Sequence, residues 1–482
     1  MKKIISVILG SVIGLSALGF AGCAFGVEDP FADDGRTVLR VSYYEAGYGG
    51  EWMEQIAAAF EKEHPDVRVS LDGDYNMEQY VGLRLENAEQ GADVADIYTT
   101  YSRVNFTTWA QKGYLEDLTD LYDRETPDGV KLKDVLLPDA LRTGKIDDSN
   151  TYWGVPWTTT VSGFIYNAKL FEENGWDTSP ETLDDFLALC ETIREAEVQN
   201  GNATVAPLVY SGATEHGYYS HPLKSWFRMY QGEQGFNEFY EYESADVYHM
   251  EGRLKAYEAM AQILGNGYAM SPSQTFDSTR LVYQAAQREF IMGNAAMITA
   301  GSWLETEMSG FLKGYPDFEM KIMPMPKIYA SEQDGKYYDL AGQEVQHINS
   351  GSADNFIIPK HAKQKELAKE FLLFMASQDM LTLYTQYTNS PRPYKYENND
   401  WSSLSTFGQS VMEVYQQSVT IAPFSIAPIA TSNWIQEYMS GSYAVSVDMS
   451  TTGSLAGSLS AAQKLWDDEY TYAQERFNTY IG

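Results

Sequence analysis

Strand-like and helical segments alternate between residues 37 and 102, and this alternation restricts the possible folds more than any other feature of the sequence. The apolar run "TVLRVSYYEAG" predicts a strand followed by a glycine-rich turn, and "EWMEQIAAAFEKEH" predicts a helix that has on one face Trp52, Ile56, Ala59 and Phe60. "PDVRVSLDGD" predicts a second strand, residues 76–92 a second helix, and "VADIYTTYS" a third short strand. Strands that alternate with helices form a parallel sheet covered on both faces. We therefore predict an α/β fold.

The same kinds of segment recur later in the chain. "TSPETLDDFLALCETIREAE" predicts a helix with Ser179 as its N-cap and Pro180 at its first position. Cys190 lies on the apolar face of this helix and is predicted to be a buried thiol. "FIMGNAAMITAGSW" (residues 290–303) predicts a helix end, a tight turn and a buried strand. "DNFIIPKHAKQKELAKEFLLFMASQ" (residues 354–378) predicts a strand followed by an amphipathic helix.

Length and charge exclude several classes of protein. The chain has 482 residues, 44% of them hydrophobic, which favours two or more hydrophobic cores over one. Its formal net charge of −33 would repel a polyanion, so we expect no binding to nucleic acid. The two cysteines, Cys23 and Cys190, argue against a disulfide scaffold.

The N-terminus has the pattern of an export signal. "MKKIISVILGSVIGLSALGFAGC" places two lysines before an apolar run that ends in small residues and Cys23. The Ala-Gly-Cys ending resembles a bacterial lipobox, with Phe20 where leucine is usual. We expect residues 1–22 to be a lipoprotein signal peptide and Cys23 to carry a lipid; an uncleaved anchor and export as a soluble protein are the alternatives. Residues 23–36 are expected to form a flexible acidic tether.

The order of these segments resembles the large extracellular solute-binding proteins of bacterial ABC importers, the carbohydrate-binding family that includes maltodextrin-binding proteins. Short matches carry the resemblance: "HPDV", the "DI" of the third strand, "GVPWTTTVSGFIYNAKLFEENGW" with "SPETLDDF", "FIMGNAAMITAGSW", and "DNFIIPKHAKQKELAKEFLLFM" with "NSPRP". Together they extend over about residues 38–393. Each is short, so the specific signal is their common order beside a lipobox.

The resemblance implies a two-lobed, periplasmic-binding-protein-like α/β fold with a hinge and a ligand cleft between the lobes. The N-terminal lobe is expected to comprise residues 37–157 and 340–390, and the C-terminal lobe residues 158–339 and 391–482. The chain would pass between the lobes near Pro156, near residues 330–345 and near Pro391. A cleft between two such sheets agrees with the general rule that ligands of open α/β sheets bind beyond the carboxyl ends of the strands.

Aromatic side chains are the first candidates for ligand contact. A sugar presents apolar C–H faces and a rim of hydroxyl groups, so its site needs flat rings and hydrogen-bonding partners. Micromolar affinity corresponds to about −8 kcal/mol and one ring platform contributes roughly 1–3 kcal/mol, so several contacts are required. The resemblance favours Trp157, Trp226 and Trp303, and Trp434 is a further candidate; packing in a core is the alternative for each. Thr160 stands where maltodextrin-binding members have an acid that contacts sugar, a departure that argues against the same ligand.

Polar candidates follow the predicted strands. They are Tyr44, Glu45 and Tyr48 after the first strand, Asp74 after the second, and Tyr101 and Arg103 after the third. Glu45 or Asp74 can accept two hydroxyl protons, and Arg103 or Arg392 can donate hydrogen bonds. A solvated loop charge is the alternative for each of these charged residues.

The sequence has no motif for catalysis or for a cofactor. "GYGGEW" has Trp52 where a dinucleotide motif needs its last glycine, and "DGDYNMEQYVGL" departs from a calcium loop at Met77 and Leu83. His216 and His221 have no clustered partners for a metal, and neither G-x-S-x-G nor a P-loop occurs. We therefore expect no enzyme activity, no metal and no cofactor.

These expectations describe a lipid-anchored receptor on the extracellular face of the cell membrane. We expect a monomer that captures a carbohydrate, an oligosaccharide, and delivers it unchanged to the transmembrane subunits of an ABC permease. Binding would be coupled to closure of the lobes by hinge rotation. A binding protein for another small solute, such as a peptide or a polyamine, is the alternative within this class. A secreted glycosidase with paired carboxylates is the alternative outside it.

Overall fold

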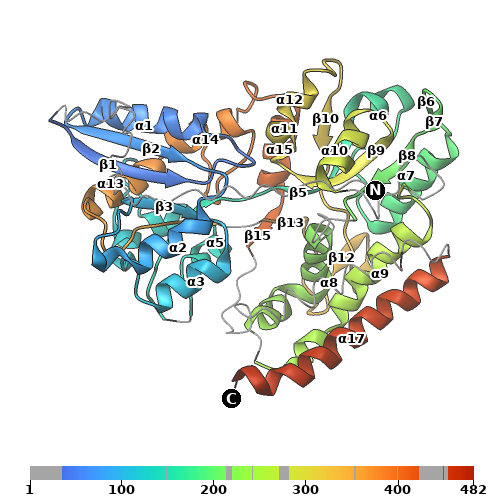
Figure 1. The fold of residues 1–482 in the computed structure, drawn as a ribbon. Helices are drawn as coiled ribbons and strands as arrows, with labels where there is room; N and C mark the ends of the chain where they lie inside the picture. Colours follow the sequence, from blue (N-terminus) through green and yellow to red (C-terminus); the bar gives the residue numbers. More distant parts are fainter. Residues whose placement is uncertain are drawn as a thin grey trace, which may run out of the picture.

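The structure is a computed structural model that describes residues 35–147, 149–212, 220–241, 243–270, 282–351, 354–398, 400–422, 449 and 454–481. The elements form two lobes that lie side by side, each built around its own β-sheet (Figure 1). Across the described ranges, no helix combines the length and the hydropathy that crossing a membrane requires.

The described residues of the N-terminal lobe form a five-stranded sheet in the order β2-β1-β3-β14-β4. The strands are β1 (Thr37–Tyr43), β2 (Val67–Gly73), β3 (Ile97–Thr100), β4 (Val155–Thr158) and β14 (Asp354–Ile357). β1 pairs in parallel with β2 and β3, as the sequence predicts. β14 is antiparallel to β3 and β4, because the chain enters it from the C-terminal lobe, at the edge where β1 and β3 end.

Helices cover both faces of this sheet. They are α1 (Glu51–Glu63), α2 (Glu78–Glu86), α3 (Arg103–Gln111), α4 (Leu132–Val135), α5 (Pro138–Thr143), α13 (Lys365–Met375), α14 (Gln378–Thr388) and the 3₁₀-helices η1 (Ala88–Gln90) and η2 (Thr119–Asp123). α1, α13 and α14 share one hydrophobic core, whereas α2 and α3 pack into another. α1 buries Trp52, Ile56 and Phe60 as predicted, and Ala57 takes the place expected for Ala59.

The C-terminal lobe contains a four-stranded sheet, in the order β10-β5-β9-β8 over its described residues. The strands are β5 (Ser162–Asn167), β8 (Ala206–Val209), β9 (Ala295–Gly301) and β10 (Met320–Ile322). β9 is buried along its whole length and is the buried strand predicted within "FIMGNAAMITAGSW". Short paired strands complete the lobe: β6 (Gln199–Asn200) with β7 (Ala203–Thr204), β11 (Ser331–Gln333) with β12 (Lys336–Tyr338), and β13 (Ile348–Ser350) with β15 (Val419–Ile421).

The helices of this lobe are α6 (Ala168–Asn174), α7 (Leu183–Glu195), α8 (Ser220–Glu241), α9 (Glu251–Gly265), α10 (Tyr283–Ile291), α11 (Leu304–Glu307), α12 (Ser309–Leu312), α15 (Thr406–Gln417), α17 (Leu455–Ile481) and the 3₁₀-helix η3 (Ala245–His249). α8 is broken at Gly232, whose φ of 83° favours glycine. α17 runs along the outer side of the lobe against α9 (Figure 1), where Glu469 forms a buried ion pair with Arg253.

α7 begins later than the sequence predicts. Thr182, not Ser179, is its N-cap: the Thr182 hydroxyl accepts a hydrogen bond from the Asp185 backbone N–H, and the Asp185 carboxylate accepts one from the Thr182 N–H. This capping box satisfies two backbone donors at once, which explains the later start. Cys190 is fully buried on this helix, as predicted, and burial raises the pKa of its thiol.

Three passages join the lobes within the described chain. The first leads from β4 to β5, the second from β13 to β14, and the third from α14 to α15. The first and third lie near Pro156 and Pro391. The second lies after Ser350 rather than at residues 330–345, because Val345 and Ile348 pack into the core of the C-terminal lobe. Residues 340–350 therefore lie with that lobe, although the sequence assigns them to the other.

Candidate functional site

The two sheets present their edges to each other at the first passage. β1, β3 and β4 end at this edge of the N-terminal sheet, and β14 begins there. On the other side, β5 begins and β9 ends at the edge of the C-terminal sheet, and Ser162 pairs with Gly301. We call the side chains at these strand ends, together with His221 of α8 beside Trp303, the interlobe site: Tyr44, Tyr48, Tyr101 and Asp354 from one lobe, and His221, Trp303 and Glu307 from the other.

Buried hydroxyl groups connect the passages below this site. The Ser162 hydroxyl donates to the carbonyl of Ser350 at 2.7 Å, which joins the first passage to the second. Ser302 Oγ lies 2.7 Å from Ser390 Oγ, which joins the end of β9 to the third passage. The hinge buries these polar groups, and the hydrogen bonds between them replace the bonds that water would otherwise make. They therefore fix the local geometry of the segments that cross between the lobes.

Thr160 belongs to this network and not to an open surface. Its side chain is buried, its Oγ1 lies 3.4 Å from Ser162 Oγ, and its carbonyl accepts a 2.8 Å hydrogen bond from Asn349 Nδ2. The expectation that Thr160 contacts ligand therefore needs correction: the consecutive threonines pack the hinge.

Trp157 lies in the core of the N-terminal lobe. Only 1% of its surface is exposed, and its ring is stacked on Trp52 with centroids 5.5 Å apart and planes at 9°. Phe356 of β14 packs 5.9 Å from the same ring. The predicted ligand platform is a core residue here, because α1 covers the face of β4 that carries this side chain.

Trp226 is likewise a core residue. It is fully buried in the C-terminal lobe, its indole N–H donates to the Pro326 carbonyl at 2.9 Å, and its ring lies 6.1 Å from Phe164. Trp226 therefore has no face for a ligand, contrary to expectation, because the inner side of α8 packs on the sheet.

The predicted arginine donors are engaged with the backbone. Arg392 is 1% exposed, and its guanidinium donates to the Trp157 carbonyl at 2.8 Å and to the Met375 carbonyl. The Arg103 guanidinium donates to the carbonyls of Thr143 and Lys145, and burial lowers the pKa of Arg103 to about 9. Both guanidinium groups thus bind backbone carbonyls of the N-terminal lobe. Contrary to expectation, neither side chain points to a ligand.

The predicted tyrosines do come together. The rings of Tyr44 and Tyr101 lie 4.5 Å apart, and Tyr101 keeps 42% of its surface exposed. Tyr48 packs edge-on against Trp157 at 6.2 Å, and its hydroxyl lies 3.4 Å from the Thr159 carbonyl. Tyr44 and Tyr101 thus form an accessible aromatic surface beside the hinge.

Tyr44 also faces the C-terminal lobe. The pKa of its hydroxyl is raised to about 12, mainly by burial and to a smaller extent by the nearby Tyr101, Asp354 and Glu307. Glu307 is on α11 of the C-terminal lobe, where it accepts a 2.7 Å hydrogen bond from Gln287. Burial raises the pKa of Glu307 as well.

Asp354 is a site residue that the sequence does not single out. It begins β14, opposite Thr158 of β4, and is half-buried. Burial raises its pKa well above the ordinary value, and the nearby Glu78 raises it further. Asp354 in turn raises the pKa values of Tyr44, Tyr48 and Tyr101, which is consistent with its place at the same edge of the sheet. In "SGSADNF" the residue resembles an ordinary loop acid, and only the pairing of β14 between β3 and β4 reveals its place.

Glu78 supports this edge of the sheet without facing a ligand. Its buried carboxylate accepts hydrogen bonds from the backbone N–H groups of Tyr101 and Ser102, the Thr100 hydroxyl and the Asn105 amide. The acid thereby caps α3 and holds the loop that carries Tyr101.

Trp303 is the predicted tryptophan that lies at the interlobe site. It follows β9 and is half-buried, with its ring over Gly301, where a Cβ atom would overlap the ring. The His221 ring lies 5.8 Å away. A Cβ on Gly47, which follows β1, would lie 3.9 Å from Trp303 Cβ, so the loops of the two lobes meet here.

Glu45 and Asp74 lie farther along the edge, at the ends of β1 and β2. Glu45 oxygens lie 2.9 Å and 3.1 Å from the positions that Cβ atoms on Gly50 and Gly73 would occupy. Asp74 accepts hydrogen bonds from the Tyr80 hydroxyl at 2.9 Å and the Asn76 N–H at 2.7 Å. These contacts hold both carboxylates against the loops that follow β1 and β2, and their contact with a ligand stays a prediction. Trp434 and Cys23 lie outside the described residues.

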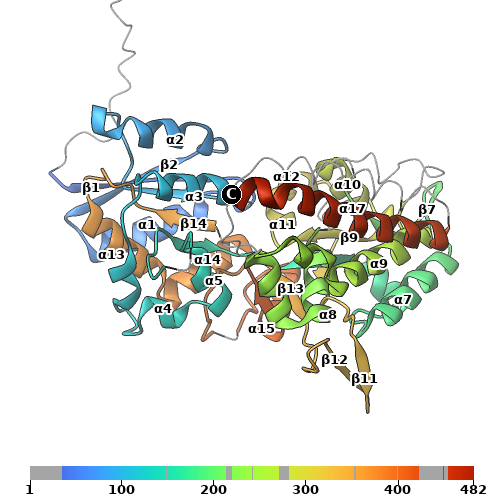
Figure 2. The same ribbon diagram turned by 90° about the horizontal axis from the view of Figure 1, so that it is seen from below.

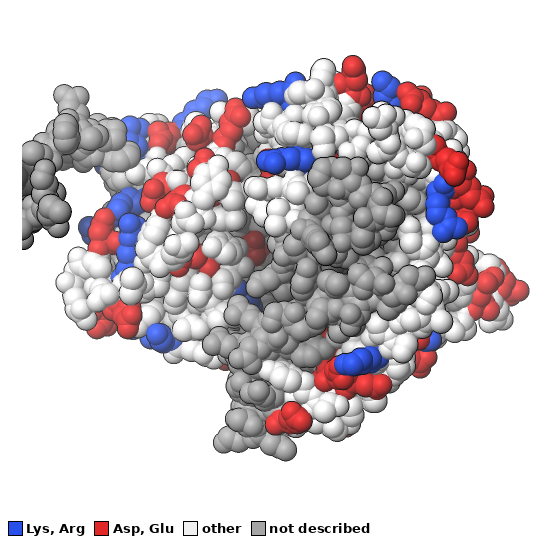
Figure 3. Space-filling view, turned by 45° about the vertical axis from the view of Figure 1, so that its right-hand side comes forward, with Lys and Arg blue, Asp and Glu red and all other residues white. Residues whose placement is uncertain are grey.

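The charged side chains of the described residues bear on two further kinds of site, one for a metal and one for a polyanion. No group of three His, Cys, Asp or Glu residues in the described ranges could hold a metal ion. On the face drawn in Figure 3, the basic side chains are scattered, and no basic patch gathers on its described part. The side chains of the interlobe site supply aromatic rings, hydroxyl groups and carboxylates.

Known proteins resemble this chain in sequence and in fold. A model of the family described as "Bacterial extracellular solute-binding protein" matches residues 46–380, more than half of the chain. The diacetylchitobiose binding protein NgcE of Streptomyces coelicolor is 21% identical over 366 residues, which cover 76% of this chain and 71% of that protein. The melibiose/raffinose/stachyose-binding protein MelE of Bacillus subtilis is 26% identical over 203 residues, 42% of each chain.

A solved structure shows that the fold is shared. The apo form of RafE from Streptococcus pneumoniae matches with a TM-score of 0.64 at 18% identity, over 91% of this chain and 100% of that one.

Proposed function

This chain belongs to the bacterial extracellular solute-binding protein family, and from that premise we propose that it captures an oligosaccharide between its lobes. The names of its relatives support a sugar: NgcE is a diacetylchitobiose binding protein and MelE a melibiose/raffinose/stachyose-binding protein. Both ligands are short chains of sugar units.

The observation that carries the proposal is the approach of the two lobes at these sheet edges, where Trp303 lies against the loop that follows β1 and Glu307 lies near Tyr44. Flat rings from facing lobes match the apolar C–H faces of a pyranose, and their contacts grow as the lobes close. Asp354 and Glu307 add acceptors for hydroxyl protons from both sides. These contacts bind a polar solute without reacting with it. We therefore propose that the sugar is bound and released unchanged.

A titration of the purified protein tests this function. The panel comprises xylo-, manno-, malto- and arabino-oligosaccharides, raffinose and diacetylchitobiose, with heats of binding measured by calorimetry. Saturable binding of at least one sugar, with the sugar recovered intact by chromatography, supports the receptor. Hydrolysis of a bound sugar would support the secreted glycosidase instead, and binding of peptides or polyamines alone would support a receptor for another solute.

Trp303→Ala is expected to weaken sugar binding by roughly 1–3 kcal/mol, because it removes one ring platform while leaving the fold intact. Calorimetry measures the dissociation constant, and thermal unfolding checks stability. Trp466→Ala is the matched control, since that indole is also half-buried but packs on His249 at the outer side of the C-terminal lobe. A Trp303→Ala protein with unchanged affinity would remove this residue from the site.

We further propose that Cys23 carries the lipid that holds the receptor at the extracellular face of the membrane, where it delivers sugar to an ABC permease. Cys23→Ala is expected to move the protein from the membrane fraction into the medium, because a non-acylated chain has no anchor. Immunoblots of the two fractions measure this. Cys190→Ala, at the buried thiol, should leave the protein at the membrane. Retention of both variants would favour an uncleaved anchor.

A further inference from the structure

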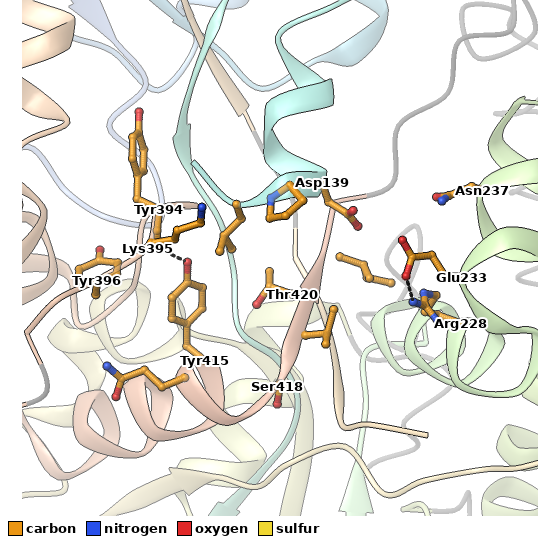
Figure 4. Close-up of a pocket in the computed structure, with 15 residues that line it drawn as sticks. Asp139, Arg228, Glu233, Asn237, Tyr394, Lys395, Tyr396, Tyr415, Ser418 and Thr420 are labelled. Atoms are coloured by element: carbon orange, nitrogen blue, oxygen red, sulfur yellow. Dashed lines mark hydrogen bonds and ion pairs between the residues drawn. The ribbon is translucent and has the colours of Figure 1, made fainter. Parts of the chain in front are cut away.

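A second cavity lies between the lobes, on the hinge side of the molecule. Its volume is about 550 Å³, and its walls come from α5 of the N-terminal lobe, α8 of the C-terminal lobe, the third passage and the segment from α15 to β15 (Figure 4). None of the interlobe-site residues lines it. In Figure 2, α5 and α15 lie toward one side of the molecule, and α3 and α10 toward the other. The cavity is therefore separate from the proposed sugar site, and its volume is in the range of small-molecule pockets.

Asp139 projects into this cavity from the start of α5 (Figure 4). It is half-buried, and burial raises the pKa of its carboxyl, which accepts a hydrogen bond from the Ala422 backbone N–H. Among the described residues, no cation forms an ion pair with it. The nearby Arg228 and Arg142 are paired with other acids: Arg228 with Glu233 at 3.0 Å, and Arg142 with Glu241 at 3.6 Å.

Neither cation that lines the cavity forms an ion pair with Asp139. Arg228 and Glu233 neutralise each other, and the Lys395 ammonium donates to the Asp134 carbonyl at 2.8 Å. Asp139 is left without a counter-ion in a partly desolvated position, which is costly for a carboxylate. A bound cation would remove this cost.

Other groups that line the cavity suit the remaining parts of an organic cation. The Ser418 hydroxyl is buried without a hydrogen-bond partner in the described chain, and Asn237 contributes an amide on the α8 side. The rings of Tyr396 and Tyr415 and the side chain of Val419 add apolar surface. Aromatic rings attract cations over their faces, and apolar walls accommodate an alkyl chain.

We propose that this hinge-side cavity binds a small organic cation, an alkylammonium or alkylguanidinium, through Asp139. Its walls come from both lobes and from the passage between them. A bound cation would therefore contact parts of the protein that move relative to one another when the hinge rotates. Rotation of the hinge would therefore change this site, so that binding of the cation and binding of the sugar would influence each other.

Calorimetric titration of the purified protein with butylammonium and ethylguanidinium tests the proposal, with butanol and butyrate as neutral and anionic controls of similar size. We expect saturable binding of the cations alone. Asp139→Asn should weaken it at least tenfold, since the amide keeps the size but loses the charge. Asp134→Asn, an exposed acid of α4 outside the cavity lining, should bind like the unaltered protein.

Further measurements separate this site from the sugar site and from misfolding. Asp139→Asn should keep its sugar affinity and its thermal midpoint, and Trp303→Ala should keep its cation affinity. Equal binding of butanol or butyrate, unchanged cation binding in Asp139→Asn, or no cation binding at all would each overturn the proposal; in the last case the cavity holds only water.

Discussion

Trp157→Ala is expected to lower the free energy of unfolding by about 3–5 kcal/mol, the usual cost of deleting a fully packed aromatic ring. The indole is 1% exposed and stacked between core residues of the N-terminal lobe, so its loss leaves a cavity between β4 and α1. Guanidinium denaturation followed by circular dichroism measures the change.

The comparison with Trp303→Ala makes this result specific. Trp303 is half-buried at the interlobe site, so its removal should cost far less stability while weakening sugar binding. A stable Trp157→Ala protein that loses only its sugar affinity would contradict the core position and restore Trp157 as a ligand platform.

Asp354→Asn is expected to weaken sugar binding by about 3 kcal/mol, more than a hundredfold, while stabilising the free protein at neutral pH. Two hydroxyl hydrogen bonds to a carboxylate account for the loss of affinity. The gain in stability follows because the amide carries no charge that burial penalises. Calorimetry and thermal unfolding at pH 7 measure the two effects.

The pH dependence follows from the direction of the pKa shift. Asp354 has a raised pKa in the folded state, so the folded protein binds more protons than the unfolded one between the two pKa values. Its contribution to stability therefore falls as the pH rises from the unfolded value through the folded value. Asp354→Asn should abolish this fall and match the unaltered protein in acid.

Sugar binding should show the opposite trend. Hydroxyl donors favour the charged carboxylate, so affinity should rise as the pH rises through the pKa of Asp354. Glu78 also acts on this carboxyl, whereas the neighbouring Tyr44, Tyr48 and Tyr101 have raised pKa values and stay protonated in this range. An affinity independent of pH, together with unchanged binding in Asp354→Asn, would exclude this acid from the site.

Most of the fold follows from local patterns. The periodicity of α1 identifies its buried face, and the uninterrupted apolar run of β9 identifies a strand buried on both sides. The start of α7 is misplaced because Ser179 and Thr182 are both good caps, and only the reciprocal bond with Asp185 decides between them. The antiparallel insertion of β14 is a tertiary event that no local pattern encodes.

The site is less predictable than the fold. Tyr44, Tyr48 and Tyr101 come together because they follow neighbouring strands, and this can be read from the strand order. Trp157, Trp226 and Trp303 are all tryptophans, so residue type does not distinguish them. Whether each side chain is buried depends on which face of a sheet a helix covers. Asp354 escapes notice because its neighbours come from strands far apart in the sequence.

The position of β14 between β3 and β4 has a consequence for the newly made polypeptide. β3 and β4 have no direct pairing, because β14 lies between them and pairs with both. β14 is synthesised about two hundred residues after β4. The first half of the chain emerging from the ribosome thus lacks the partner that completes its sheet, so it cannot finish folding as it is translated. The sheet of the N-terminal lobe therefore stays incomplete until about three quarters of the polypeptide has been made.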